Sequence, residues 1–189
     1  MTYTLHYNSP VGRILLAGRE DALTGLWLEG QKYFAATLPA ETAARETPLL
    51  RQTAQWLDRY FAGKRPALTE LPLAPEGSAF RREVWQLLGE IPYGEVTTYG
   101  GIAAKLAARR GASPVSAQAV GGAVGHNPIA ILIPCHRVVG ADGSLTGYAG
   151  GTERKSRLLL LERGADPATK EKKEHGEDGD AVFGLEKNS

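Results

Sequence analysis

The chain has 189 residues, with 22 basic and 21 acidic side chains and a net charge of +1. That length can bury a proper core, as one domain or two small ones. There is no run of about 18 apolar residues, which predicts no membrane span, and the first residues lack the apolar stretch of a secretion signal. The single cysteine excludes an internal disulfide and a cysteine-based zinc cluster, and it favours a reducing cytoplasm.

Charge is distributed unevenly along the chain. Residues 80–165 carry 10 basic and 6 acidic side chains, a net +4, whereas residues 166–189 carry 4 basic and 7 acidic ones, a net −3. The first value leans towards a polyanionic partner, although charge alone does not establish DNA binding. The polar, acidic composition of residues 166–189 predicts a disordered tail.

The first third of the chain predicts a β-rich unit with one helix. Residues 2–8, 13–18 and 22–29 are strand candidates. Residues 48–61 have the wide apolar face of a helix, which Gly63 ends. Four Pro and Gly residues between positions 65 and 77 indicate a linker.

The rest of the chain predicts four helices. Ser78 caps the first, which runs to about residue 89, and Thr97 or Thr98 caps the second, residues 99–108. Ser113-Pro114 starts a third, which ends before Asn127-Pro128, and the second and third form either a helix-turn-helix or an ordinary helical hairpin. Thr152 caps a last helix, with Gly164 at its C′ position.

The predicted third helix contains three glycines, Gly121, Gly122 and Gly125. Each interior glycine costs about 0.8–1 kcal/mol relative to alanine. A helix that accepts this cost needs a face without side chains, where either a DNA backbone or another helix can approach closely.

The only cysteine follows a strongly apolar run, residues 129–133, which predicts a short buried strand. Pro134 cannot extend a sheet ladder, so the chain turns at Cys135. His136 and Arg137 follow, and positive charge there would lower the pKa of the thiol and favour the nucleophilic thiolate. The alternative is a small buried hydrophobic side chain, the commonest role of a lone cysteine.

Five further motifs accompany this cysteine in a fixed order. They are Ile91-Pro92-Tyr93-Gly94-Glu95-Val96-Thr97-Thr98-Tyr99, Ala119-Val120-Gly121-Gly122-Ala123, Asn127-Pro128, Tyr148-Ala149-Gly150-Gly151 and Leu161-Glu162-Arg163-Gly164. With Pro134-Cys135-His136-Arg137-Val138, this series resembles the O6-alkylguanine-DNA alkyltransferases, which repair DNA by direct reversal. The resemblance is strong over residues 78–165 and present only in outline over residues 1–77.

The resemblance implies an α+β fold. Residues 1–77 would form an N-terminal domain with an antiparallel sheet plus helix, and residues 78–165 a mainly helical, winged-helix-like domain with a helix-turn-helix. It also implies irreversible transfer of an alkyl group, typically methyl, from O6-alkylguanine in double-stranded DNA to Cys135, once per molecule. O4-alkylthymine is a second possible substrate. No cofactor and no metal are implied, and the protein is expected to be monomeric.

Residue roles follow from the same resemblance. Cys135 is the nucleophile, His136 relays its proton through water, Glu162 orients His136, Tyr99 protonates the leaving guanine and Asn127 supports the reactive turn. Glu162 stands in the last turn of its predicted helix, where the dipole disfavours a carboxylate. Residues expected to bind the flipped base or DNA are Gln118, Gly121, Gly122, Arg137, Val138, Tyr148, Ala149, Gly150 and Lys155. Arg137 is also expected to pair within the protein and brace the turn.

The chain departs from the usual family pattern in three places. Gln118 replaces an arginine that fills the gap left by the flipped base, and Ala149 replaces a serine. Residues 107–115 are longer than usual. Two other classes of function remain: a non-catalytic alkyltransferase-like lesion sensor, which would lack the nucleophile, and an unrelated cysteine hydrolase or helix-turn-helix regulator.

Overall fold

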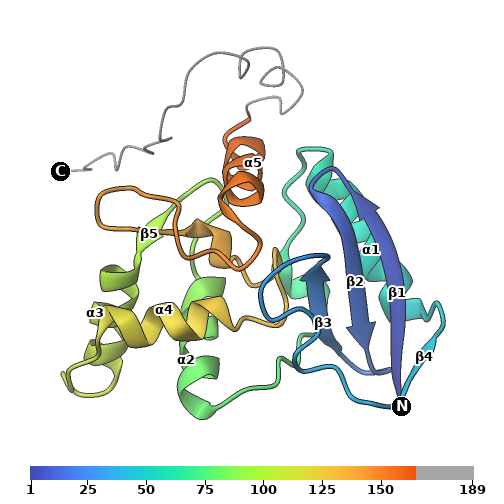
Figure 1. Cartoon of the computed structure of the whole chain (residues 1–189), viewed down its shortest axis with the longest axis horizontal. Helices are drawn as coiled ribbons and strands as arrows, with labels where there is room; N and C mark the ends of the chain where they lie inside the picture. Colours follow the sequence, from blue (N-terminus) through green and yellow to red (C-terminus); the bar gives the residue numbers. More distant parts are fainter. Residues whose placement is uncertain (165–189) are drawn as a thin grey trace.

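The computed structural model describes residues 1–164 and shows an α+β fold (Figure 1). Its four-stranded sheet has the order β3-β2-β1-β4, with β1 antiparallel to β2, β2 antiparallel to β3 and β4 parallel to β1. The strands are β1 (Thr2–Ser9), β2 (Gly12–Gly18), β3 (Leu23–Leu28) and β4 (Thr42–Ala44). The three predicted strands are confirmed. The predicted tail, residues 166–189, lies outside the described residues.

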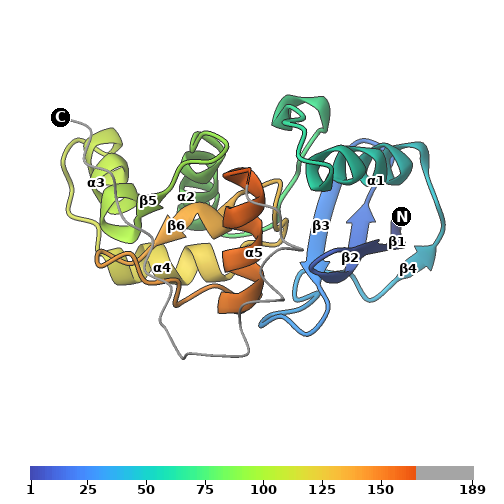
Figure 2. The same ribbon diagram turned by 90° about the horizontal axis from the view of Figure 1, so that it is seen from above.

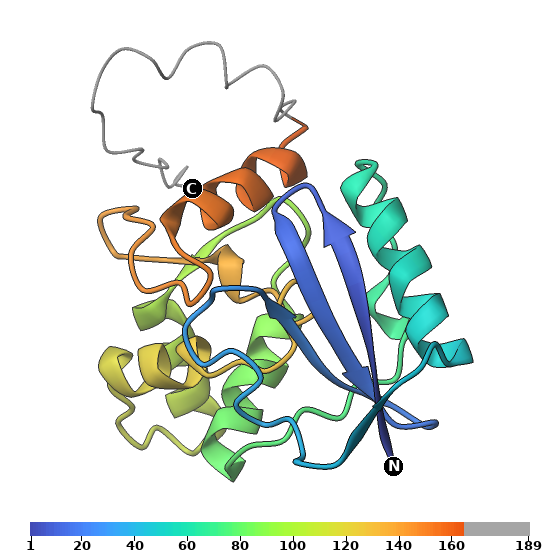
Figure 3. The same cartoon turned by 45° about the vertical axis from the view of Figure 1, so that its right-hand side comes forward.

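The sheet is buried on both faces near its β3 edge. Helix α1 (Pro48–Phe61) packs along one face, as Figures 2 and 3 show, and its bounds match the prediction. On the other face a small apolar cluster forms around Trp27, Leu15 and Ala17. Burial on both faces explains why β2 and β3 are almost continuously apolar rather than alternating.

The remaining helices lie in the half of the molecule that carries the cysteine (Figure 1). They are α2 (Ala79–Gly89), α3 (Tyr99–Arg109), α4 (Ala117–Gly125) and α5 (Thr152–Glu162). Ser78 and Thr98 cap α2 and α3 through side-chain oxygens, as predicted. A seven-residue connection joins α3 to α4, and the two helices pack together, as both the helix-turn-helix and the helical hairpin require.

Two predicted helix starts are wrong. Helix α4 begins after Ser116, whose hydroxyl accepts from the backbone N–H of Ala119, and not at Ser113-Pro114. Both sites carry a serine, and the tertiary contacts of α4 with α2 and α3 decide which one caps. Helix α5 is preceded by Gly151 at φ 89°, which takes the cap position, so Thr152 is its first residue rather than its cap.

The predicted strand at residues 129–133 is also wrong. Only Ile129 bridges to Leu26 of β3, and the chain then turns, with Ile131 at φ 68°. All five residues are buried, at most 5% exposed. An apolar run of this length is buried equally well as a strand or as a folded turn, so its periodicity could not separate the two.

The cysteine turn itself is a single 3₁₀ turn, η2 (Cys135–Arg137), followed by the short strand β6 (Val138–Val139). Strand β6 pairs in parallel with β5 (Thr97–Thr98), just before α3. This pairing fixes the cysteine turn beside the first helix of the helix-turn-helix. Within residues 1–164, no helix is long and apolar enough to cross a membrane.

Gly94 holds the segment before β5 against the end of α5. It adopts φ 79°, and a Cβ built there would lie 3.2 Å from the backbone oxygen of Glu162. A side chain is therefore disfavoured by both the backbone conformation and the contact.

We predict that Gly94→Ala lowers the free energy of unfolding by about 1–3 kcal/mol, because left-handed backbone strain and overpacking add. The matched control is Gly89→Ala at the end of α2, where a Cβ meets no atom within 4 Å. That variant should be neutral or slightly stabilised. Urea unfolding of both variants measures the difference, and equal stabilities would contradict the role given to Gly94.

Candidate active site

Cys135 lies at the first position of η2 and is 5% exposed. Pro134 precedes it, and the backbone N–H of Cys135 donates to Ile133 O at 2.7 Å. The turn therefore places the thiol within the core cluster that contains residues of both the sheet and the helices. A nucleophile at this depth can react only with a group that enters the protein.

The electrostatics at the thiol differ from the prediction made from its neighbours. Burial raises the pKa of Cys135, while a hydrogen bond from Asn127, the charge of Lys155 and backbone N–H groups lower it. The net direction is upward. Arg137, which follows in sequence, does not act on the thiol because its guanidinium is engaged elsewhere. The cation that favours the thiolate is Lys155 on α5.

Asn127 braces the turn that leads to the cysteine. Its Nδ2 donates to Ile133 O at 2.8 Å, and its Oδ1 accepts from Ile129 N at 3.0 Å. It is 5% exposed. Because both ends of the amide are used, Asn127 fixes residues 129–133. Asn127 also lies within hydrogen-bonding reach of Cys135.

His136 is fully buried and bonds Glu162, with Nε2 2.6 Å from Oε1. Burial lowers the pKa of His136 and outweighs the raising effect of Glu162, so the ring is neutral near pH 7. A carboxylate only accepts, so Nε2 must carry the hydrogen and Nδ1 is left with its lone pair. Among the described residues Nδ1 has no hydrogen-bond partner. The imidazole is thus held in the tautomer of a base.

Glu162 receives donors from several separate segments. Besides His136, they are Tyr60 Oη of α1 at 2.8 Å and the backbone N–H of Gly94 at 3.2 Å. Arg137 donates to both carboxylate oxygens, at 2.9 and 3.0 Å. Burial opposes ionisation of Glu162, but the bonds from His136 and Arg137 outweigh it and hold its pKa far below the usual range.

Arg137 is 4% exposed and pairs within the protein, in agreement with the prediction that it braces the turn. Its Nη1 donates to Ile91 O at 2.7 Å, in addition to the two bonds to Glu162. Each guanidinium nitrogen donates within the protein and the side chain is buried, which argues against the binding role that the resemblance suggested. Tyr60 of α1 donates to the same carboxylate through its hydroxyl and was not predicted to belong to the site.

Two tyrosines and a lysine face the thiol from other elements. Tyr99, the first residue of α3, is half-buried and donates to Thr146 O at 3.3 Å. Tyr148 is 9% exposed, and Lys155 Nζ lies 5.8 Å from its ring centre and 5.9 Å from that of Tyr99. Burial raises the pKa of both tyrosines, and a charge on Cys135 would raise it further. Both phenols therefore keep their protons at neutral pH.

The segment around Tyr148 is held against the sheet. Ala149 O accepts from Lys32 N at 2.9 Å, and a Cβ at Gly150 would lie 2.9 Å from Leu28. Val138 is fully buried in β6, paired with Thr97. These contacts bring the predicted pocket residues to the side of the cysteine turn.

Helix α4 presents an open face. Gln118 is exposed near its start, and Val120, Ala123 and Val124 are its buried residues. A Cβ at Gly122 or Gly125 would meet no atom within 4 Å, and one at Gly121 would be 3.9 Å from Tyr99. Of the two explanations for the glycines, tight helix packing therefore fails at Gly122 and Gly125, and approach by a ligand remains.

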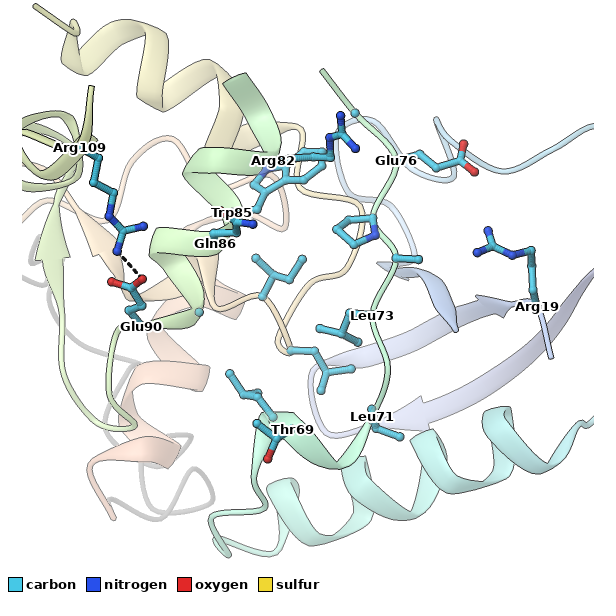
Figure 4. A pocket seen from close by; sticks show the side chains of 17 residues that line it. Arg19, Thr69, Leu71, Leu73, Glu76, Arg82, Trp85, Gln86, Glu90 and Arg109 are labelled. Atoms are coloured by element: carbon cyan, nitrogen blue, oxygen red, sulfur yellow. Dashed lines mark hydrogen bonds and ion pairs between the residues drawn. The ribbon is translucent and has the colours of Figure 1, made fainter. Parts of the chain in front are cut away.

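A groove of about 1110 Å³ lies elsewhere, between the linker and α2 (Figure 4). Leu71, Leu73 and Trp85 line it, and an ion pair joins Arg109 to Glu90 at one side. None of the predicted site residues lines this groove. Within residues 1–164, no group of three or more His, Cys, Asp or Glu residues is arranged to hold a metal ion.

The sequence placed Lys155 only in a general binding role, although its spacing carries a signal. Lys155, Leu158, Leu159 and Glu162 follow the helical repeat of one face, and all four are buried. Two charged residues on the same helix face as two core leucines indicate charged side chains that are buried in the fold. The spacing of this face therefore predicts that Lys155 and Glu162 are buried.

Comparisons with known proteins agree with this geometry. Residues 79–164 match the 6-O-methylguanine DNA methyltransferase DNA-binding domain, and residues 1–75 match the ribonuclease-like domain of the same family. The methylated-DNA–protein-cysteine methyltransferase of Mycolicibacterium paratuberculosis is 47% identical over 86% of this chain and 93% of its own. That of Haemophilus influenzae is 42% identical over 85% and 86%.

Solved structures are similar as well. The O6-methylguanine methyltransferase of Mycobacterium tuberculosis superimposes with a TM-score of 0.74 at 40% identity, covering 89% of this chain and 96% of that one. The M. tuberculosis protein in complex with DNA gives a TM-score of 0.73 over the same shares. The chain therefore belongs to the 6-O-methylguanine DNA methyltransferase family.

Proposed function

We propose that this protein repairs DNA by direct reversal, through irreversible transfer of an alkyl group from O6-alkylguanine to Cys135. The observation that carries the proposal is the buried thiol next to a neutral imidazole whose free Nδ1 is set by Glu162. The family membership supports the same reaction. The proposed substrate is double-stranded DNA that contains O6-alkylguanine.

Activation of the thiol is the first step. No direct side-chain bond joins His136 to Cys135 among the described residues, so a water molecule would carry the thiol proton to Nδ1. Glu162 accepts from Nε2 and stabilises the imidazolium that forms. Arg137 and Tyr60 keep Glu162 ionised and in place.

Bond exchange is the second step. The thiolate sulfur forms a bond to the alkyl carbon, the bond from that carbon to O6 breaks, and its electron pair stays on guanine. Guanine then needs a proton, and Tyr99, whose raised pKa keeps its phenol protonated, is the proposed donor. The thioether left on Cys135 has no low-energy route back to the thiol, so each molecule would act once.

DNA would dock on the open face of α4. A base stacked in a duplex cannot reach a thiol that is 5% exposed, so the target nucleotide must flip out. Gln118 would lie at the gap, Gly121 and Gly122 would admit the backbone, and Tyr148, Ala149, Gly150 and Val138 would surround the base. Residues 1–77 and 78–165 would act as two domains of one monomer, since a single chain supplies every group named. The unpaired thiol favours the cytoplasm as the place of action.

The lesion-sensor alternative is less well supported, because such a protein needs no nucleophile and this chain keeps both Cys135 and the base behind it. A cysteine hydrolase would release its product and regain a free thiol. Intact-protein mass after exposure to an O6-methylguanine duplex separates transfer from the other two. Transfer adds one methyl group to the protein, whereas sensing and hydrolysis add none.

We predict that Cys135→Ser abolishes transfer while the fold and DNA binding persist, because a hydroxyl ionises far less readily than a thiol. Single-turnover kinetics on a methylated duplex measure the rate, and circular dichroism and fluorescence anisotropy check fold and binding. Transfer at even a tenth of the wild-type rate would remove Cys135 as the nucleophile.

Gln118→Arg tests the docking face. The added charge would meet DNA phosphates, so we predict tighter binding at low salt and a slope of log affinity against log salt that is steeper by about one unit. The control is Gln55→Arg, which adds the same charge on the exposed side of α1. Fluorescence anisotropy across a salt series gives both slopes. If Gln118→Arg and Gln55→Arg behave alike, α4 does not face DNA through Gln118.

A further inference from the structure

Lys155, in the first half of α5, is fully buried, and its Nζ has no hydrogen-bond partner among the described residues. An ammonium group removed from water without a partner is strongly disfavoured. Lysine is also rarely buried, since its stem usually lets the charge reach solvent. A side chain that the fold keeps in this state must meet an opposite charge at some stage of the protein's action.

The groups that face Lys155 come from three other elements. They are Cys135 and His136 of η2, Tyr99 of α3 and Tyr148 of the loop before α5. His136 is neutral, and both tyrosines have raised pKa values, so they do not supply an anion near pH 7. Glu162, on the same helix, is already occupied by His136, Arg137 and Tyr60. Among the described residues that face Lys155, Cys135 is the remaining one that can become an anion.

We propose that the Lys155 ammonium is the counter-charge of the Cys135 thiolate and thereby sets the pH range in which the thiol can react. The inference deepens the proposed function, because it assigns the electrostatic support of the nucleophile to a side chain outside the Cys135, His136 and Glu162 series. Inside a poorly hydrated pocket such a charge pair is stronger than in water.

The protonation states are consistent with this role. Burial lowers the pKa of Lys155 to about 8, and the charge of Cys135 acts in the opposite direction. The two groups therefore titrate as a coupled pair. When the pair loses one proton, the state with thiolate and ammonium keeps its charges together, and it is the reactive state. Without the ammonium, only burial and hydrogen bonds act on the thiol, and its pKa rises.

Alkylation reverses the situation. Once sulfur forms its bond to carbon, the thioether is neutral and Lys155 loses the negative charge that Cys135 can supply. Burial then acts alone on the ammonium, and its pKa falls. Modification of Cys135 should therefore make Lys155 a stronger acid, a change that a purely structural lysine would not show.

The first test needs no DNA, because Cys135 is the only cysteine in the chain. The rate of carbamidomethylation by iodoacetamide is followed by intact mass from pH 6 to 10. We expect Lys155→Met to react about tenfold more slowly at pH 7.5 and to reach its half-maximal rate at higher pH, since one pKa unit is a tenfold change in thiolate. The control, Arg157→Met, removes a half-buried cation from the same helix and should follow the wild type.

A Lys155→Met protein that is folded, as judged by its thermal midpoint, and has the wild-type pH profile would overturn the proposal. A second measurement uses the wild-type protein and holds even if the variant does not fold. With ¹³C-labelled lysine, NMR gives the titration midpoint of Lys155 before and after Cys135 is methylated with iodomethane. We expect a lower midpoint after methylation, and an unchanged midpoint would also overturn the proposal. Because neither test uses alkylguanine, failure of the proposed repair function would not affect them.

Discussion

The carboxylate of Glu162 accepts hydrogen bonds from α1, from the turn before β5 and from two consecutive residues of η2. The most distant donor, Tyr60, is 102 residues from Glu162 in sequence, and the buried carboxylate brings these segments together. An ion in such a position is stable only when all its partners are present, because a buried charge that loses one of them costs several kcal/mol. The geometry of the cysteine turn therefore depends on α1 and on the turn before β5 as well as on its own neighbours.

The same cluster links folding to pH. The pKa of Glu162 is lowered in the folded protein, so its stabilising effect is present above its unfolded pKa and is lost as pH falls. The pKa of His136 is also lowered, so below about pH 6.5 the unfolded chain takes up a proton that the folded protein refuses. Both groups make the protein less stable in acid. Unfolding in acid would thus also abolish the arrangement of His136 and Glu162 that the proposed reaction requires.

Local signals in the sequence were enough for much of the fold. The capping serine and threonine of α2 and α3, the bounds of α1 and the turn at Cys135 each depend on a few neighbouring residues, and each is confirmed. The turn at Ile131 and the start of α4 depend on contacts between distant segments, which the sequence does not reveal. The prediction that Arg137 lowers the pKa of the thiol was wrong for the same reason. The nearest cation in sequence, Arg137, is held by Glu162, while Lys155, 20 residues away, faces the sulfur.

Glu162→Gln measured in single-turnover transfer tests most directly whether one carboxylate serves both fold and chemistry. A glutamine removes the anion and can present its amide N–H₂ to His136, which disturbs the tautomer with free Nδ1. We expect transfer to slow at least about tenfold, but by less than loss of the thiol, together with a lower free energy of unfolding. The control, Glu153→Gln, makes the same change at an exposed position of α5 and should leave both quantities unchanged. A folded Glu162→Gln protein with the wild-type rate would contradict the account.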